Sequence, residues 1–283
     1  MTNHKVATRQ EWQAARDELL TQEKELTRRG DRLAAARRAL PWVPIEKDYR
    51  FGTAEGPKTL RELFDGRSQL IVYHFMFGPD YTAGCPACSS GADSFNGAVP
   101  HLNARDGTVT CISRAPPDKL QAYQRPMAWT FPWASPHGSD YNLDLETSRP
   151  QEATREFLAG GVPAVAARLA QDCGTEPAAY LSETPGMTAY ALEDRTVYLT
   201  YSTTARGLEF MIGYYGFLDR APLGRNEGDP PEMWIRRHDE YHNANPTTQC
   251  AQGHHLGRRP GSPRPGAPSR RSSPGAARPH RNG

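Results

Sequence analysis

The sequence predicts an α/β fold preceded by a helical arm, and three patterns lead to this prediction. The apolar run 70–77 is rich in β-branched and aromatic residues and lies between turn residues, which is typical of a strand buried on both faces. A helical pattern and a second short apolar strand, 109–112, follow it, as expected for parallel strands joined by a right-handed crossover. The segments 187–192 and 197–201 have the pattern of a β-hairpin.

The first forty residues form the predicted arm. Thr8 and Glu11 have the spacing of a capping box, and a helical pattern runs from there to the break at 41–44. Gly30 predicts a kink or a break on the way. One large apolar residue recurs at every seventh position: Trp12, Leu19, Leu26, Leu33 and Leu40. The second heptad position is mixed, so we expect this stripe to pack against the body of the protein or across a homodimer interface, not to form a zipper.

The middle of the chain contains short elements around the central strand. Segment 47–58 predicts a hairpin around its two glycines, and 59–64 a short amphipathic turn. The helix that follows the central strand is expected to include Phe95, Val99 and Leu102 at helical spacing. A further helix is expected from Asp118 through Tyr123. The aromatic stretch 129–133 is a candidate third strand.

The last third of the chain predicts helices around the hairpin, followed by a tail. Segment 151–173 is helical in pattern and is divided by glycines and a proline, and 208–218 has the 3.6-residue period of a closing helix. Ordered composition ends with 234–241. We therefore predict an arm at 1–40, a domain at 41–245 and a disordered Pro-, Gly- and Arg-rich tail at 246–283.

Charge and composition limit the class of protein. The tail holds seven arginines and no acidic residue, so a whole-chain charge of +2 leaves about −5 on residues 1–245. The basic balance therefore does not indicate a nucleic-acid-binding body. Five cysteines, an odd number, do not resemble a secreted disulfide framework. With neither an apolar leader nor a run of about 20 apolar residues, we expect a cytoplasmic protein without a membrane partner.

The pair Cys85 and Cys88 carries the chemistry that the sequence indicates. If Cys85 caps a helix that begins at Pro86, the free N–H groups of the first turn and the helix dipole favour a thiolate there. Cys88, one turn later, is within reach to close a disulfide. A Cys-x-x-Cys pair at a strand-to-helix junction is typical of thioredoxin-like redox motifs.

Two other interpretations of this pair stay open. The spacing also suits half of a zinc site, but Cys111, Cys173 and Cys250 are scattered, and only His254 and His255 lie near another cysteine. The pair could also be structural, without chemistry. We expect no metal and no cofactor. The run His238, Asp239 and Glu240 is expected to cap or form ion pairs, because its members do not share a helix face.

Several segments together resemble the DUF899 family, bacterial proteins described as predicted dithiol-disulfide oxidoreductases. The resemblance covers about residues 4–245 and lies in 70–79, 84–88, 113–116, 201–203 and 236–241. It implies a thioredoxin-like three-layer sandwich with a mixed central sheet. It does not extend to the arginine-rich tail.

The resemblance also implies supporting residues. Thioredoxin-like proteins place a cis-proline beside the cysteines, and Pro185, before the hairpin, matches best; the alternative is an ordinary turn proline. Tyr81 is expected at the mouth of the site. Thr82 stands three residues before Cys85, as in peroxiredoxins, although the accompanying proline is one residue too close. Arg114 is a candidate to stabilise a thiolate or bind a carboxylate, with a surface ion pair as its alternative.

These observations favour a thiol-disulfide oxidoreductase with Cys85 as nucleophile and Cys88 as resolving thiol. Its partner would be a protein or small-molecule thiol or disulfide. A peroxiredoxin-like peroxidase that uses Cys85 and a non-catalytic binding protein of the same fold are the alternatives. His74, in the buried strand, is interpreted as a satisfied core histidine in preference to a proton shuttle.

Overall fold

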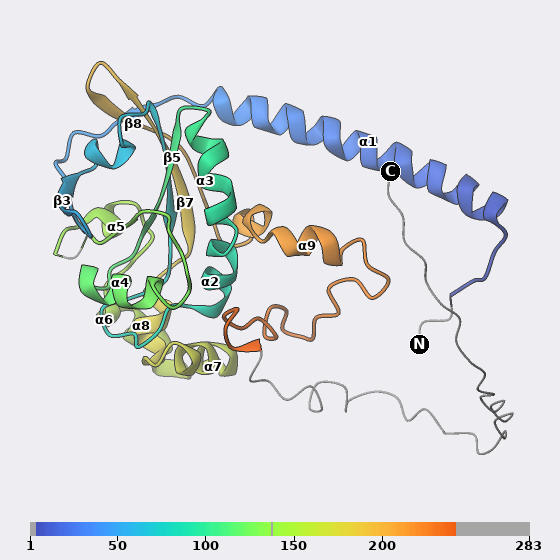
Figure 1. The fold of residues 1–283 in the computed structure, drawn as a ribbon. Helices are drawn as coiled ribbons and strands as arrows, with labels where there is room; N and C mark the ends of the chain where they lie inside the picture. Colours follow the sequence, from blue (N-terminus) through green and yellow to red (C-terminus); the bar gives the residue numbers. More distant parts are fainter. Residues whose placement is uncertain (1–3, 137, 242–283) are drawn as a thin grey trace, which may run out of the picture. The chain divides into compact units, whose positions relative to one another are not determined.

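A mixed six-stranded sheet forms the centre of the computed structural model, which describes residues 4–136 and 138–241 (Figure 1). Its strand order is β1-β8-β7-β4-β5-β6. The strands are β1 (Val43–Pro44), β4 (Gln69–His74), β5 (Gly107–Ile112), β6 (Trp133–Ala134), β7 (Gly186–Glu193) and β8 (Thr196–Thr204). β4, β5 and β6 run parallel, whereas β7 is antiparallel to β4 and to β8.

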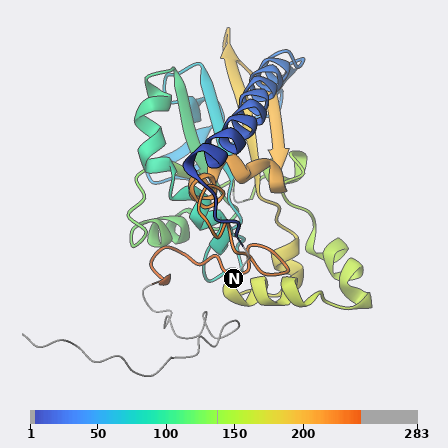
Figure 2. The same cartoon turned by 90° about the vertical axis from the view of Figure 1, so that its right-hand side faces the viewer.

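This arrangement is the predicted thioredoxin-like fold. A parallel pair joined by a crossover helix lies beside an antiparallel hairpin, and helices cover both faces of the sheet (Figure 1). In Figure 2 the two long strands of the hairpin are gold, and the yellow-green helices that precede them in sequence lie towards one end. The predicted third strand is reduced to the two residues of β6.

The two faces of β4 build two separate cores, because successive side chains of a strand point to opposite faces. Leu70 and Val72 belong to a cluster that includes the aromatic rings of Phe51 and Tyr141. Tyr73 belongs to the other cluster, which contains four cysteines together with Trp129 and Trp133. The strand is thus buried on both faces, as its continuous apolar sequence predicts.

Helices of the first half cover these faces. They are η1 (Glu62–Phe64), α2 (Pro86–Ala92), α3 (Phe95–Asn103), α4 (Pro117–Gln124) and α5 (Tyr141–Asp144). The predicted helix after the cysteines is two helices, because residues 93 and 94 form a turn in which the Ser94 N–H bonds the Gly91 carbonyl three residues earlier. A separate ribbon, β2 (Arg50–Thr53) with β3 (Gly56–Thr59), forms the hairpin predicted around its glycines.

The second half follows the prediction with one exception. The helical segment is divided into α6 (Gln151–Phe157), η2 (Leu158–Gly160) and α7 (Ala164–Asp172), and α8 (Pro177–Leu181) precedes the hairpin. The prediction of a single closing helix is wrong. The chain forms two helices there, η3 (Ala205–Met211) and α9 (Gly213–Leu218), because Ile212 between them has a ψ of 74°, which is not helical. Segment 234–241, the last one with ordered composition, consists of turns and irregular backbone.

The arm is a thirty-residue helix, α1 (Arg9–Arg38), with the predicted capping box between Thr8 and Glu11. It passes through Gly30 without interruption, so the predicted break is wrong; the neighbouring residues are strong helix formers and outweigh one glycine. The large residues of the heptad stripe are 45% to 71% exposed. The stripe therefore does not pack against the body of its own chain.

Residues 4–136 and 138–241 belong to one compact unit. The predicted tail at 246–283, with Cys250, His254 and His255, lies outside the described residues. Within 4–136 and 138–241, none of the helices combines the length and the apolar character that crossing a bilayer requires.

Candidate active site

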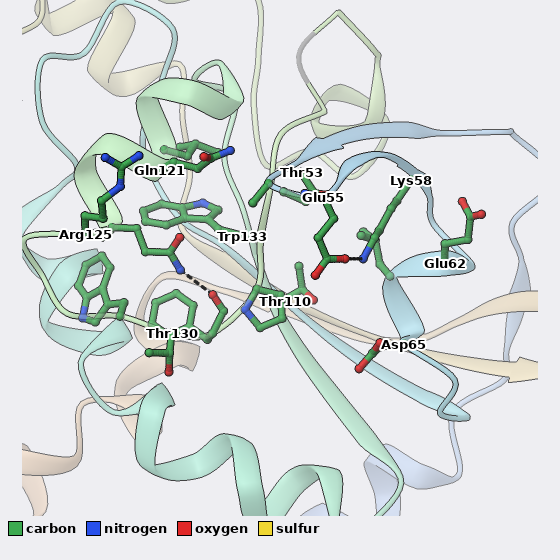
Figure 3. A pocket seen from close by; sticks show the side chains of 18 residues that line it. Thr53, Glu55, Lys58, Glu62, Asp65, Thr110, Gln121, Arg125, Thr130 and Trp133 are labelled. Carbon is green, nitrogen blue, oxygen red and sulfur yellow. Dashed lines mark hydrogen bonds and ion pairs between the residues drawn. The ribbon is translucent and has the colours of Figure 1, made fainter.

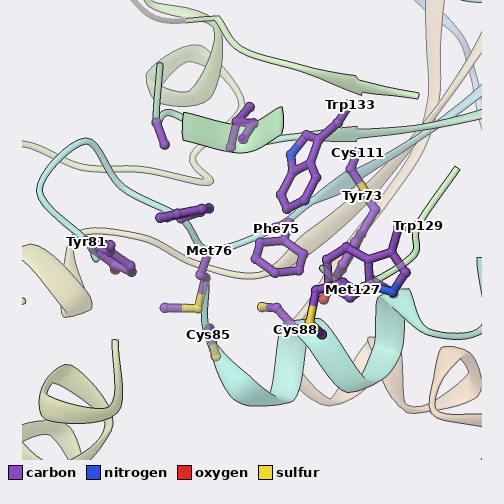
Figure 4. Close-up of a cluster of buried hydrophobic side chains, with 14 of the residues drawn as sticks. Tyr73, Phe75, Met76, Tyr81, Cys85, Cys88, Cys111, Met127, Trp129 and Trp133 are labelled. Atoms are coloured by element: carbon purple, nitrogen blue, oxygen red, sulfur yellow. The ribbon is translucent and has the colours of Figure 1, made fainter. Parts of the chain in front are cut away.

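Cys85 directly precedes helix α2, and Pro86 is the first residue of that helix, as predicted. The backbone N–H of Cys85 donates to the Met76 carbonyl at 3.1 Å, which ties the loop to the end of the central strand. The Cys85 carbonyl accepts the first hydrogen bond of the helix from Ser89 at 2.9 Å. Both cysteines are free thiols and buried (Figure 4).

A third cysteine, Cys173, joins the pair. It ends helix α7, and its carbonyl accepts hydrogen bonds from the backbone N–H groups of Thr82 and Ala83 at 3.0 and 3.3 Å. Its side chain lies in the same buried cluster as Cys85 and Cys88. In the sequence, Cys173 is one of several scattered cysteines.

The glycine that follows Cys173 is the one local sequence signal that the end of α7 packs closely against the loop before Cys85. Gly174 has a positive φ of 60°, and a Cβ built there would lie 1.8 Å from the Thr82 hydroxyl oxygen. Only glycine permits both this conformation and this contact. A Cys-Gly pair at a helix end, however, also fits an ordinary helix terminus, so the sequence did not distinguish the two.

The three sulfurs differ in protonation. The pKa of Cys85 lies well below its usual value, because the Cys173 thiol, then the Cys88 thiol, stabilise the thiolate, with help from the Cys88 backbone N–H and the Tyr180 hydroxyl. Burial raises the pKa of Cys88. The hydrogen bond to the Cys85 thiolate, and burial, raise the pKa of Cys173. Negative charge in the site is therefore favoured on Cys85 over Cys88 and Cys173.

Arg237 fixes the loop and the end of α7 together. Its guanidinium donates to the Gly84 carbonyl at 2.6 and 3.0 Å and to the Asp172 carbonyl at 2.7 Å. These residues immediately precede Cys85 and Cys173 in the sequence. The guanidinium also donates to the Tyr123 hydroxyl and pairs with Glu240. Arg237 lies in segment 236–241, which resembles the family, but no local sequence pattern indicates its role.

Cys85 and Cys88 line a cavity of about 340 Å³. Figure 4 shows Met76 beside the two cysteines at the start of the helix. Apolar side chains of the cavity come from the end of β4, from α2 and from η3, and the acidic residues Glu183, Glu209 and Glu232 also line it. Helix and loop thus place the two cysteines together on the wall of this cavity.

A family model described as "Bacterial protein of unknown function (DUF899)" matches residues 1–241. The chain belongs to this family. A search of curated proteins found no match.

Solved structures that resemble this DUF899 protein are peroxiredoxins of low sequence identity. Peroxidoxin BcpB from Mycobacterium tuberculosis is 14% identical, with 63% of this chain and 92% of that chain covered and a TM-score of 0.40. For PrxQ from Xylella fastidiosa the identity is 13%, the coverage 60% and 88%, and the TM-score 0.39. The mitochondrial 2-Cys peroxiredoxin from Plasmodium falciparum is 10% identical, with 64% of this chain and 92% of that chain covered and a TM-score of 0.35.

Tyr81 does not lie at its predicted position in the DUF899 site, whereas Thr82 has a contact that supports the cysteine loop. Tyr81 is buried, and its hydroxyl donates to the carbonyls of Ala179 and Tyr180 at 3.3 and 3.1 Å, so its placement at the mouth is wrong. Its ring instead fixes helix α8 against the cysteine loop. The Thr82 hydroxyl donates to the Cys173 carbonyl at 3.4 Å. Both residues therefore support the loop from behind.

Arg114 and Pro185 lie close to the cavity. The Arg114 guanidinium donates to Glu183 at 2.8 Å, and the Glu183 carboxylate, although it is buried, also accepts from Ser148. Arg114 thus binds a carboxylate of the protein, and burial raises the pKa of Glu183. Pro185 lines the cavity directly before β7, as predicted. Among the described residues the one cis peptide bond precedes Pro230, so Pro185 is a trans proline.

The two histidines near this region have structural contacts. His74 is buried, shares a hydrogen bond of 2.8 Å with Thr188 and stacks on Tyr141, and burial lowers its pKa to about 3. It is a satisfied core histidine. His238 contacts the Asp93 carboxylate at 2.7 Å, an ion pair when the ring is protonated.

In the part of the chain that the structure describes, no three His, Cys, Asp or Glu side chains are grouped closely enough to hold a metal ion, so the structure offers no ligand set for the zinc interpretation.

A second cavity, of about 430 Å³, lies on the side of the β2–β3 ribbon and contains neither cysteine (Figure 3). Trp133, Arg125 and Gln121 line one side, and Glu55 and Lys58, which form an ion pair, line the other.

Proposed function

We propose that this DUF899 protein is a thiol-disulfide oxidoreductase in which Cys85 is the nucleophile and Cys88 the resolving thiol. The observation that carries the proposal is that Cys85, at the start of helix α2, and Cys88 line one cavity together; the lowered pKa of Cys85 supports it. A nucleophile must be deprotonated and a resolving thiol must lie within reach of it, and this pair meets both conditions.

The proposed reaction has two steps. The Cys85 thiolate attacks one sulfur of a substrate disulfide, forms a mixed disulfide and releases the other sulfur as a thiolate. The Cys88 thiol then gives up its proton and attacks the Cys85 sulfur, so that the Cys85–Cys88 disulfide forms and the second substrate thiol leaves with that proton. The substrate gains two electrons and the protein loses two; the reverse sequence oxidises a dithiol.

The cavity limits the class of substrate. Cys85 is only 3% exposed, so a broad protein surface does not reach its sulfur. A small disulfide or an extended peptide segment fits a cavity of about 340 Å³ with apolar walls. We propose such a thiol or disulfide as the partner. A reducing compartment such as the cytoplasm suits the four free cysteines of the described residues.

Redox titration tests the proposal. The protein is equilibrated with glutathione buffers of increasing oxidising strength, and the Cys85–Cys88 disulfide is quantified by mass spectrometry after alkylation. We expect a single two-electron transition for this pair. In the reduced protein, iodoacetamide near neutral pH should modify Cys85 before Cys88, because the pKa of Cys85 is lowered and that of Cys88 is raised. A chain whose Cys85 forms no disulfide in any buffer would refute the proposal.

The peroxidase alternative uses the same sulfur and has a separate signature. There the Cys85 thiolate attacks a peroxide oxygen, becomes a sulfenic acid and releases hydroxide or an alkoxide. The Tyr180 hydroxyl, 3.9 Å from the Cys85 sulfur, is a donor that such a reaction uses, and this contact is the observation that favours it. Peroxide consumption at a rate well above that of free cysteine would support this alternative over disulfide exchange.

A further inference from the structure

The Cys85 sulfur has two thiol neighbours that come from different parts of the chain. Cys88 lies one helical turn after it, whereas Cys173 is contributed by the end of α7. The side chains of all three cysteines belong to one buried cluster. A nucleophilic sulfur with two other thiols in its own cluster has two possible partners for a disulfide.

Backbone contacts hold Cys173 in this place independently of its thiol. The N–H groups of Thr82 and Ala83 bond its carbonyl, and the guanidinium of Arg237 bridges Gly84 and Asp172. The three residues before Cys85 are therefore held against Cys173 and the residue before it. The side chain of Cys173 is fully buried within the same cluster as Cys85 and Cys88.

The two partners differ in their access to the cavity. Cys88 lines it together with Cys85, whereas Cys173 is not among the lining residues. A Cys85–Cys88 disulfide thus faces the cavity, whereas a Cys85–Cys173 disulfide has one sulfur shielded behind the loop. Exchange between the two bonds therefore changes whether a substrate in the cavity faces a disulfide or the free thiol of Cys88.

We propose that Cys173 is a second resolving thiol for Cys85, which moves the disulfide from the pair that faces the cavity to a buried pair. The proposal rests on the function proposed above. The Cys173 sulfur, on losing its proton, attacks the Cys85 sulfur of the Cys85–Cys88 disulfide. The Cys85–Cys173 bond forms, the Cys85–Cys88 bond breaks, and Cys88 leaves as a thiolate that takes up the proton. This is an isomerisation, so it needs no external oxidant or reductant.

The same attack resolves a mixed disulfide when Cys88 is absent. Cys173 attacks the Cys85 sulfur of a Cys85–glutathione adduct, and glutathione leaves as the thiol. Cys88 is then not essential for resolution. The expected difference is therefore between a protein that lacks Cys88 alone and one that lacks both resolving thiols.

The experiment uses glutathione disulfide as the probe and four full-length proteins. They are the wild type, Cys88→Ala, the double variant Cys88→Ala/Cys173→Ala, and Cys111→Ala as a control, which removes a buried thiol of β5. After addition of one equivalent of glutathione disulfide, samples are quenched in acid, alkylated and mapped by mass spectrometry over time.

We expect the Cys85–glutathione adduct to decay at least ten-fold faster in Cys88→Ala than in the double variant, with a Cys85–Cys173 disulfide as the product. Oxidised wild type and Cys111→Ala should both contain this disulfide beside Cys85–Cys88. Equal lifetimes of the adduct in the two alanine variants, together with no Cys85–Cys173 bond in oxidised wild type, would overturn the proposal. In that case a long-lived adduct would still support Cys85 as nucleophile, whereas the absence of any adduct would refute the proposed function itself.

Discussion

Replacement of Arg237 by methionine tests whether one buried guanidinium holds the site together. Its side chain is 9% exposed, and it donates to the carbonyls of Gly84 and Asp172, which precede the two cysteines on separate segments. Methionine keeps the aliphatic stem but has no donor. Arg237→Met therefore removes the bridge between the segments with little change in side-chain volume.

The cost follows from the groups that lose a partner. The Gly84 carbonyl is buried, and a buried acceptor left without a donor costs about 1–3 kcal/mol. The Asp172 carbonyl is partly buried, and loss of its donor lowers the free energy of unfolding by about 1 kcal/mol. The Glu240 carboxylate is 38% exposed, so loss of its ion pair adds less than about 1 kcal/mol. The sum is about 3 kcal/mol, which for a domain of this size lowers Tm by about 6–12 °C.

Thermal unfolding followed by circular dichroism measures this change, and the neighbouring arginine provides a matched control. The Arg236 guanidinium donates only within its own segment, to the carbonyls of Met233 and Ile235. Arg236→Met should therefore lower Tm by no more than about 3 °C. Arg237→Met should also slow iodoacetamide modification of Cys85 at pH 7, because Cys173 is no longer held beside it. If both variants melt within about 2 °C of each other, the bridge does not contribute as argued.

Three further predictions concern other parts of the chain. Burial lowers the pKa of His74 to about 3, so neutral His74 contributes fully to the free energy of unfolding above the unfolded pKa of about 6.5, and this contribution is lost as the pH falls towards 3. Chemical denaturation should show that the free energy of unfolding is about 2 kcal/mol lower at pH 5 than at pH 7 in the wild type, and His74→Gln should lack this decrease. An identical pH dependence in the variant would contradict the prediction. The exposed α1 stripe should bury itself in a homodimer, so light scattering should show a dimer that Leu26→Glu converts to a monomer; a monomeric wild type would disprove it. Truncation after Tyr241 should leave Tm unchanged, and a drop of several degrees would show that the tail packs.

Local patterns were enough to predict most of the fold. The buried strand, the cysteine pair at the start of a helix and the closing hairpin each depend on residues that are near one another in the sequence. Periodicity, turn residues and a proline at the first helical position report on such neighbours. The capping box of α1 is another example, since both of its side chains lie within one turn.

The composition of the site was decided by the tertiary structure. Thr82 and Cys173 are 91 residues apart, and Arg237 and Gly84 are 153 apart, so no periodic pattern relates them. For the same reason Tyr81 was placed at the mouth although its hydroxyl bonds carbonyls of a distant helix. The sequence by itself determined which sulfur starts a helix. Which thiols surround that sulfur, and therefore where its thiolate is stabilised, depended on how distant segments pack, because hydrogen bonding and burial act through space.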